Sequence, residues 1–165
     1  MIIFLVGMPA SGKSTLAKKI AEIYNFTVVD LDNLIEKKYQ KTIPQIFAEE
    51  GEFFFRKLES QSLKELIFNK NTVISTGGGT PCFYDNMEFI IEKGIAIFLD
   101  TPLSTIIDRI CQNISQRPIF QGKTQEAVQK QLEELYKQRK PFYQKAHYQI
   151  MNELDFFELE LIKNI

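Results

Sequence analysis

Residues Gly7 to Thr15 read GMPASGKST, a short segment that combines glycines, one lysine and hydroxyl side chains at fixed spacing. It fills the pattern G-x-x-x-x-G-K-[ST], in which consecutive backbone N–H groups turn inward to bind phosphate oxygens. Lys13 places a cation beside the outer phosphates, and the Ser14 hydroxyl is suited to a bound Mg²⁺ ion. The segment therefore predicts a site for a nucleoside triphosphate.

The residues on either side of this loop favour the same interpretation. Ile2–Val6 is an unbroken apolar run of strand length, and apolar side chains recur at helical spacing after the loop. A glycine loop between a strand and a helix directs the positive end of the helix at the phosphates. An ordinary Gly/Ser turn between two elements is the alternative. The nucleotide-binding residues predicted in the loop are Ala10, Ser11, Gly12, Lys13, Ser14 and Thr15.

Two carboxylates follow the next apolar run, at the exit of a predicted strand that ends with Val28-Val29. Nucleotide-bound Mg²⁺ keeps several waters and needs a carboxylate nearby, so Asp30 and Ser14 form the predicted metal site. Asp32 can orient an attacking hydroxyl group and accept its proton, which makes it the predicted catalytic base. A helix N-cap is the structural alternative for Asp32, and Asp100 is the next candidate for the metal.

Apolar runs of strand length alternate with helical patterns along the chain. The strands are expected at Ile2–Val6, Phe26–Val29, Thr72–Ser75, Gly94–Leu99 and Tyr148–Met151. The helices are expected at Lys13–Tyr24, Asp32–Tyr39, Ile43–Glu50, Gly51–Asn69, Tyr84–Lys93, Pro102–Cys111, Thr124–Lys145 and Leu154–Lys163. This alternation predicts an α/β fold in three layers, α/β/α, with a five-stranded parallel sheet of the P-loop kinase type. In such sheets the active site lies beyond the C-terminal ends of the strands.

We expect one domain over residues 1–165, with an acceptor-binding helical region at about residues 32–60. The least regular stretch is NISQRPIFQGK, residues 113–123, which contains Pro118 and Gly122 and joins two helical patterns. A polar loop with such residues is typical of a mobile lid, here at about residues 112–124. A plain surface connector is the alternative.

The composition argues against several classes of partner. The net charge is −1, so nothing favours nucleic acid as a partner. No apolar stretch approaches the length of a membrane span, and the first strand begins at once, which leaves no room for a signal peptide. Cys82 and Cys111 fit no zinc pattern and indicate reduced thiols, with Cys82 as a passive small side chain. We therefore expect a cytoplasmic monomer that does not bind membranes.

Six motifs occur together, in order, across nearly the whole chain. They are GMPASGKST from Gly7, DLD from Asp30, IFAEEGEFFFRKLES from Ile46, STGGGT from Ser75, RP from Arg117 and RKPFY from Arg139. In this combination the chain resembles the shikimate kinase family, small P-loop kinases of the nucleoside-monophosphate-kinase-like group. The most specific part is G-E-x-x-F-R-x-x-E together with the triple glycine. The resemblance implies that ATP donates its γ-phosphoryl group to the 3-hydroxyl of shikimate in aromatic amino acid biosynthesis, with Mg²⁺ as the cofactor.

The resemblance also assigns residues to an organic-acid acceptor. Arg56 and Arg139 would hold the shikimate carboxylate, and Glu59 would aim Arg56. The loop Gly77-Gly78-Gly79 would lie against the acid end of the substrate. The residues agree, because Arg56 and Glu59 share a helix face, and Phe53–Phe55 predict that this face is partly buried. The alternatives are a surface ion pair, a flexible glycine turn and, for Arg139, an ordinary helix charge.

Two further arginines are predicted to bind the nucleotide. Arg117, in the predicted lid, resembles the family's phosphate-contacting arginine and completes a catalytic set with Lys13 and Asp32. Arg109 resembles the residue that lies on adenine, and a solvent-facing helix arginine is the alternative.

The chain departs from the family pattern in two places. Gln45, preceded by Pro44, stands where the family usually has an acidic residue, and residues 151–165 lack an evident adenine-loop signature. Two other functions compete with the one implied. A related small kinase could act on gluconate or a nucleoside monophosphate, although nucleotide acceptors call for several more phosphate-binding arginines. A nucleotide-binding switch would bind ATP without acceptor-stimulated release of ADP.

Overall fold

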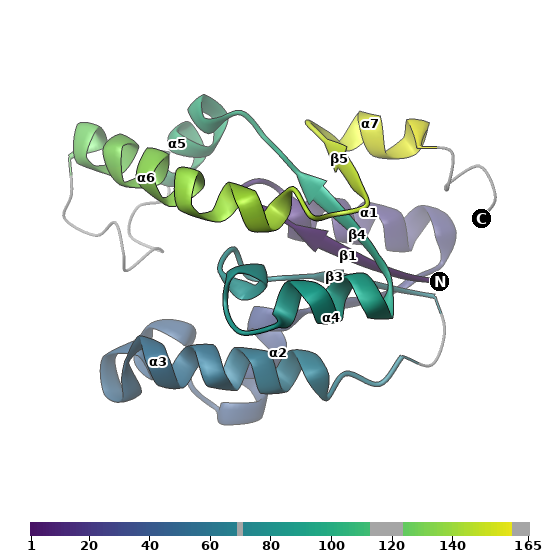
Figure 1. Ribbon diagram of the computed structural model, residues 1–165, viewed down its shortest axis with the longest axis horizontal. Helices are drawn as coiled ribbons and strands as arrows, with labels where there is room; N and C mark the ends of the chain where they lie inside the picture. Colours follow the sequence, from purple (N-terminus) through teal and green to yellow (C-terminus); the bar gives the residue numbers. More distant parts are fainter. Residues whose placement is uncertain (69–70, 113–123, 160–165) are drawn as a thin grey trace.

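Strand β1, Ile2–Val6, lies at the centre of a parallel sheet whose strand order is β2-β3-β1-β4-β5 (Figure 1). The other strands are β2, Thr27–Asp30; β3, Thr72–Ser75; β4, Ile95–Leu99; and β5, Tyr148–Ile150. This computed structural model describes residues 1–68, 71–112 and 124–159. All four strand pairings are parallel, so the carboxyl ends of the strands meet at one edge. The predicted α/β fold with a five-stranded parallel sheet is confirmed.

Helices lie on both faces of the sheet (Figure 1). Their bounds are α1, Lys13–Tyr24; α2, Leu31–Tyr39; α3, Ile43–Lys64; α4, Asn86–Lys93; α5, Leu103–Gln112; α6, Gln125–Tyr143; and α7, Glu153–Glu158. A short 3₁₀ helix, η1, spans Thr80–Cys82. Within the described ranges, no helix has both the length and the apolar composition needed to cross a membrane.

Alternate residues of β1 point into two separate hydrophobic cores, as the period of two along a strand requires. Phe4 and Val6 belong to the core beneath α2–α6, whereas Ile3 and Leu5 belong to the core beneath α1 and α7. All four side chains are fully buried. A strand that is apolar on both faces is typical of a central parallel strand, because helices cover both sides of it.

The sequence predicted the bounds of β1, β3 and α1 correctly, and most other elements shift by one or two residues at an end. The largest difference concerns α3, which joins two helices predicted separately at Ile43–Glu50 and Gly51–Asn69 and ends at Lys64. The helix has a kink at Gly51, whose φ of 80° and ψ of 171° are not helical. Such a conformation is open essentially only to glycine. Gly51 is also the residue at which the sequence predicted the second helix to begin, so the kink and the predicted boundary coincide.

Candidate active site

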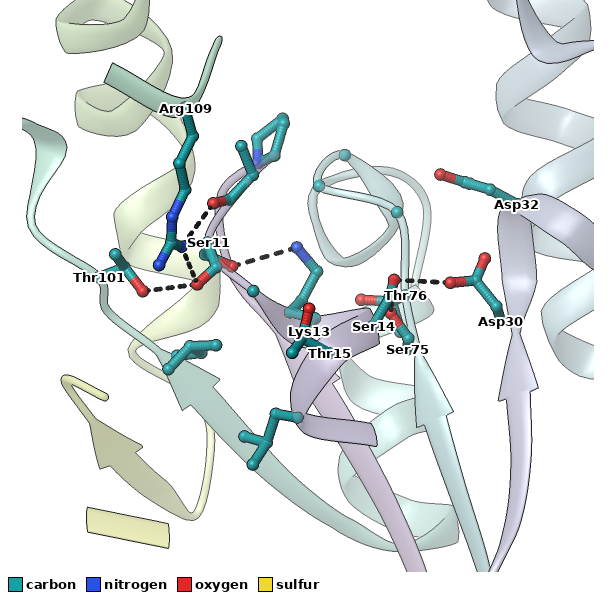
Figure 2. A pocket seen from close by; sticks show the side chains of 18 of the residues that line it. Ser11, Lys13, Ser14, Thr15, Asp30, Asp32, Ser75, Thr76, Thr101 and Arg109 are labelled. Atoms are coloured by element: carbon teal, nitrogen blue, oxygen red, sulfur yellow. Dashed lines mark hydrogen bonds between the residues drawn. The ribbon is translucent and has the colours of Figure 1, made fainter. Parts of the chain in front are cut away.

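The segments that follow all five strands of the sheet line one cavity of about 950 Å³ at its carboxyl edge (Figure 2). The cavity contains every described residue that the sequence assigns to the site: Ala10, Ser11, Gly12, Lys13, Ser14, Thr15, Asp30, Asp32, Arg56, Gly77, Gly78, Gly79, Arg109 and Arg139. Arg117 and residues 113–123 of the predicted lid lie outside the described residues, so both stay predictions. Segments far apart in the sequence therefore converge where the topology requires.

Lys13 begins α1, and its side chain folds back over the loop that precedes it (Figure 2). The Nζ atom donates to the carbonyl oxygens of Gly7 at 2.9 Å and Met8 at 2.8 Å, and it lies 3.4 Å from Ser11 Oγ. The loop also holds Ala10 at a φ of 61°, a left-handed conformation that is uncommon for alanine and frequent at binding sites. The loop therefore fixes the ammonium group at the wall of the cavity.

Ser14 lies between two oxygen-bearing side chains from neighbouring strands. Its hydroxyl group donates to Asp30 Oδ2 at 2.7 Å and lies 3.0 Å from Ser75 Oγ (Figure 2). The sequence predicted Ser14 and Asp30 as a metal site but missed Ser75. The signal for Ser75 was its place as the last residue of β3, beside the ends of β1 and β2. Three hard oxygen donors at one point fit a cation such as Mg²⁺.

The structure decides two of the alternatives for the acidic residues. Asp30, not Asp32, is the N-cap of α2, because its Oδ1 atom accepts from Asn33 N at 3.2 Å. Asp32 lies in the first turn of that helix. Asp100 does not line the cavity, since its carboxylate accepts from Tyr136 and Gln149, each at 2.8 Å.

Asp32 has a carboxyl group whose pKa is raised from 3.8 to about 6. Burial is the largest cause, because it disfavours the charged form, and the negative charges of Glu59 and Asp30 add to it. The cations Lys13 and Arg56 oppose the rise in pKa. A carboxyl group with a pKa of about 6 is ionised at neutral pH and still basic enough to accept a proton.

Arg56 is buried in the second half of α3, and two carboxylates of the same helix contact it. Its Nη1 atom donates to Glu59 Oε2 at 2.8 Å, and its Nε and Nη2 atoms donate to Glu52 Oε1 at 3.3 and 3.2 Å. The predicted burial of the helix face that carries Arg56 and Glu59 is thus confirmed. Of the three consecutive phenylalanines that predicted it, only Phe55 is buried, whereas Phe53 is 78% exposed and Phe54 is 40% exposed.

The three rings around Arg56 come from α3 and from the segment that follows η1. The centre of its guanidinium group lies 4.4 Å from the ring centroid of Phe83, 5.2 Å from that of Phe55 and 5.9 Å from that of Phe47. Arg56 therefore lies in an aromatic surrounding, where ion pairing is stronger than at an open surface.

The triple glycine leaves no room for side chains. A Cβ atom on Gly77 would lie 2.8 Å from Glu59 Oε1, and one on Gly79 would lie 2.5 Å from Arg56 Nη1. One on Gly78 would lie 2.6 Å from Pro9 Cδ, in the phosphate loop. The absence of side chains lets the backbone approach the Glu59 carboxylate at Gly77, the phosphate loop at Gly78 and the Arg56 guanidinium group at Gly79. This excludes the alternative of a merely flexible turn.

The glycine loop is also held by residues that the sequence did not assign to the site. Thr80 Oγ1 donates to Glu59 Oε1 at 2.6 Å, and the buried Tyr143 hydroxyl donates to Gly78 O at 2.5 Å. Burial raises the pKa of Tyr143, which stays protonated, and the nearby positive charge of Arg139 opposes that rise. Arg139 is therefore near the glycine loop as well as in the cavity wall.

Arg109 crosses from α5 to the phosphate loop. Its Nη1 atom donates to the carbonyl oxygens of Ala10 at 3.0 Å and Ser11 at 3.1 Å (Figure 2). The Thr101 hydroxyl, which the sequence did not point to, donates to the same Ser11 oxygen at 2.8 Å. Arg109 is thus exposed yet directed at the loop, and its contact with adenine stays a prediction.

Comparison with known proteins agrees with this geometry. The shikimate kinase family model matches residues 9–165. A shikimate kinase from Bacteroides thetaiotaomicron is 42% identical over 146 residues, covering 88% of this chain and 83% of that protein. The crystal structure of shikimate kinase from that organism superposes with a TM-score of 0.88 at 40% identity, covering 93% of this chain and 87% of that one. Shikimate kinase from Acinetobacter baumannii, in complex with shikimate, also superposes with a TM-score of 0.88, at 36% identity over 99% of this chain and 93% of that one. The chain therefore belongs to the shikimate kinase family.

Proposed function

We propose that the protein is a shikimate kinase, which transfers the γ-phosphoryl group of ATP to the 3-hydroxyl group of shikimate. The observation that carries this proposal is the single cavity shared by Lys13, Asp32, Arg56 and Arg139. A phosphate loop, a base of raised pKa and two guanidinium groups in one cavity suit a phosphoryl donor and a hydroxylated organic acid. The family match and the relative in complex with shikimate support the same acceptor.

The described residues divide the work between the two substrates. Arg56 and Arg139 bind the acceptor carboxylate, which places the ring between them and Asp32. Asp32 orients the hydroxyl group that attacks the γ-phosphorus atom and takes its proton at a carboxylate oxygen. Lys13 leaves its loop carbonyl partners for phosphate oxygens and stabilises the charge that spreads over them in the transition state.

The residues also fit the Mg²⁺ ion that accompanies ATP. Ser14 and Asp30 would hold it, with the Ser75 hydroxyl beside them, and the remaining places would go to water and phosphate oxygens. Among the described residues no group of three or more His, Cys, Asp or Glu side chains is placed to hold a metal ion. When bound, the ion neutralises charge on the transferring phosphates.

The proposal also covers the lid, the adenine contact, the oligomeric state and the location of the protein. Arg117 contacts the transferring phosphate from a lid at about residues 112–124, and Arg109 lies against adenine. The protein works as a monomer of one domain in the cytoplasm, where Cys82 and Cys111 stay reduced. Both thiols are free, and burial raises the pKa of Cys82 to about 11, which suits a passive side chain.

Release of ADP at fixed Mg-ATP, measured with and without shikimate, tests the proposal. We expect shikimate to stimulate ADP release strongly and gluconate or nucleoside monophosphates to have no effect. Lys13→Ala and Asp32→Asn should each lower turnover by about 10²–10³-fold. Phosphorus NMR of the product should show one new phosphate ester. ADP release that no acceptor stimulates would instead favour a nucleotide-binding switch.

A further inference from the structure

The two carboxylate partners of Arg56 differ in how firmly they are held. Glu59 is 1% exposed, and its second oxygen accepts from the buried Thr80 hydroxyl. The Glu52 side chain is 58% exposed, and its only polar side-chain contacts within the described part of the chain are to Arg56. Glu59 is thus a fixed partner of the guanidinium group, whereas Glu52 can move into solvent without losing any other polar side-chain contact that the described residues make with it.

The contact with Glu52 occupies the edge of Arg56 that an incoming carboxylate needs. Nη1 is engaged by Glu59 at 2.8 Å, which leaves Nε and Nη2 as the adjacent pair for a bidentate acid. A single oxygen of Glu52 lies 3.3 and 3.2 Å from these two atoms. A bidentate carboxylate instead makes two parallel bonds of about 2.7–2.9 Å. Glu52 therefore holds this edge more weakly than a well-placed organic acid would.

The backbone next to Glu52 has room to move. Gly51 interrupts α3 with a φ of 80° and a ψ of 171°, and apart from its chain neighbours and the adjoining helix backbone no atom lies within 4 Å of the place where its Cβ would be. Glu52 is the first residue after this break, so its rotation need not disturb the packed part of the helix around Arg56.

We propose that Glu52 is an internal carboxylate that occupies the acceptor-binding edge of Arg56 and must be displaced when shikimate binds. This inference rests on the proposed function. Glu52 then acts on specificity, since a buried arginine in an aromatic surrounding would otherwise attract any small anion. A simple monocarboxylate that gains only the contact with Arg56 competes poorly with Glu52, whereas shikimate, which Arg139 and Asp32 also contact, displaces it.

The test compares Glu52→Gln and Glu52→Ala with the unaltered enzyme in steady-state kinetics and calorimetric titration with shikimate. We expect the KM and Kd for shikimate to fall by about two- to sixfold, in line with the strength of a half-exposed ion pair. The KM for ATP should stay the same, and kcat should change less than the KM for shikimate. Benzoate, a simple monocarboxylate, should inhibit both variants at lower concentration than it inhibits the unaltered enzyme.

Glu49→Gln is the matched control, because Glu49 lies on the same helix with a side chain 50% exposed and pairs with Lys41 instead. This control removes the same negative charge from the same helix. If it lowers the KM for shikimate as much as the Glu52 variants do, general charge repulsion of the anionic substrate is the cause and the proposal is overturned. A KM for shikimate that rises or is unchanged in both Glu52 variants would also overturn it, since Glu52 would then support Arg56 or be idle. If the unaltered enzyme neither binds nor phosphorylates shikimate, the proposed function itself fails.

Discussion

Asp32 and Glu59 approach the same point from two different helices. A Cβ atom on Gly77 would lie 2.9 Å from Asp32 Oδ1 and 2.8 Å from Glu59 Oε1. Glu59 also binds Arg56, so one buried carboxylate contacts the acceptor-binding cation and faces the proposed base. Because its negative charge raises the pKa of Asp32, acceptor binding and proton transfer are linked through Glu59.

The activity should therefore fall in mild acid. The pKa of Asp32 is about 6 in the free enzyme, and protonation removes the proposed base. We expect kcat/KM for shikimate to decline below a pH of about 6 and to be level above it, as measured in a pH–rate profile.

The Glu59→Gln variant shows whether the fall in activity at low pH comes from protonation of Asp32 or from protonation of a substrate. The variant removes a charge that raises the pKa of Asp32, so the acid limb should move to lower pH, whereas a substrate's titration would stay in place. An acid limb that does not move in this variant would contradict the assignment of Asp32.

Asp32→Asn should stabilise the protein while it removes activity. A carboxyl group whose pKa is higher in the folded state binds more protons there, so stability declines as the pH rises from 3.8 to about 6. The loss of stability caused by ionising the buried Asp32 carboxyl group is absent below pH 3.8 and complete above about pH 6. Asparagine does not ionise, so the variant avoids this loss. We expect a gain of about 1–3 kcal/mol in the free energy of unfolding at neutral pH.

Denaturant unfolding at two pH values checks this prediction. The gain from Asp32→Asn should be full at about pH 7 and should be much smaller near pH 4, where aspartate is also partly protonated in the unfolded chain. A variant that is less stable than the unaltered enzyme at neutral pH would show that Asp32 has a structural role that outweighs its burial.

Much of the fold could be predicted because its centre is regular. The strand β1 is apolar on both faces and α1 repeats apolar residues at helical spacing, so both bounds were right. The edge strand β2 is partly exposed, and there the predicted Phe26–Val29 differs from the observed Thr27–Asp30. The cluster of three phenylalanines was also misleading for Phe53, an apolar residue that the chain leaves exposed.

The position of site residues could be predicted where they lie within one sequence motif, as Ala10 to Thr15 do in the phosphate loop. The contacts that hold those residues were not predictable, because they join distant parts of the chain. Ser14 meets Ser75 across 61 positions, and Thr80 meets Glu59 across 21. A hydroxyl side chain carries no pattern that names its partner, so only the folded topology brings these pairs into contact.

Thr80→Val should weaken both the fold and acceptor binding. Valine has the shape of threonine without the hydroxyl group, so the buried Glu59 carboxylate would lose a donor that now lies at 2.6 Å. We expect a loss of about 1–3 kcal/mol in the free energy of unfolding and a higher KM for shikimate, because Glu59 would then hold Arg56 less firmly. Thr80→Ser keeps the hydroxyl group and should recover the KM for shikimate, and no recovery would mean that packing of the methyl group matters instead.

Gly79→Ala and Gly78→Ala should separate the acceptor site from the nucleotide site. Neither glycine has a positive φ, so alanine suits both backbones and only the new Cβ atom matters. At Gly79 that atom would lie 2.5–2.7 Å from three atoms of the Arg56 guanidinium group, which must therefore shift from its present position. The KM for shikimate should rise by about tenfold or more while the KM for ATP stays the same.

The matched variant Gly78→Ala should act on the other substrate. Its Cβ atom would lie 2.6–2.9 Å from ring and backbone atoms of Pro9, which precedes the phosphate-binding residues of the loop. Because a proline ring cannot swing aside as a long side chain can, the phosphate loop itself must shift, and we expect the KM for ATP to rise. Steady-state kinetics with each substrate varied in turn measures both effects. Equal effects of the two variants on both KM values would mean that the glycine loop moves as one body and does not divide its contacts between the two substrates.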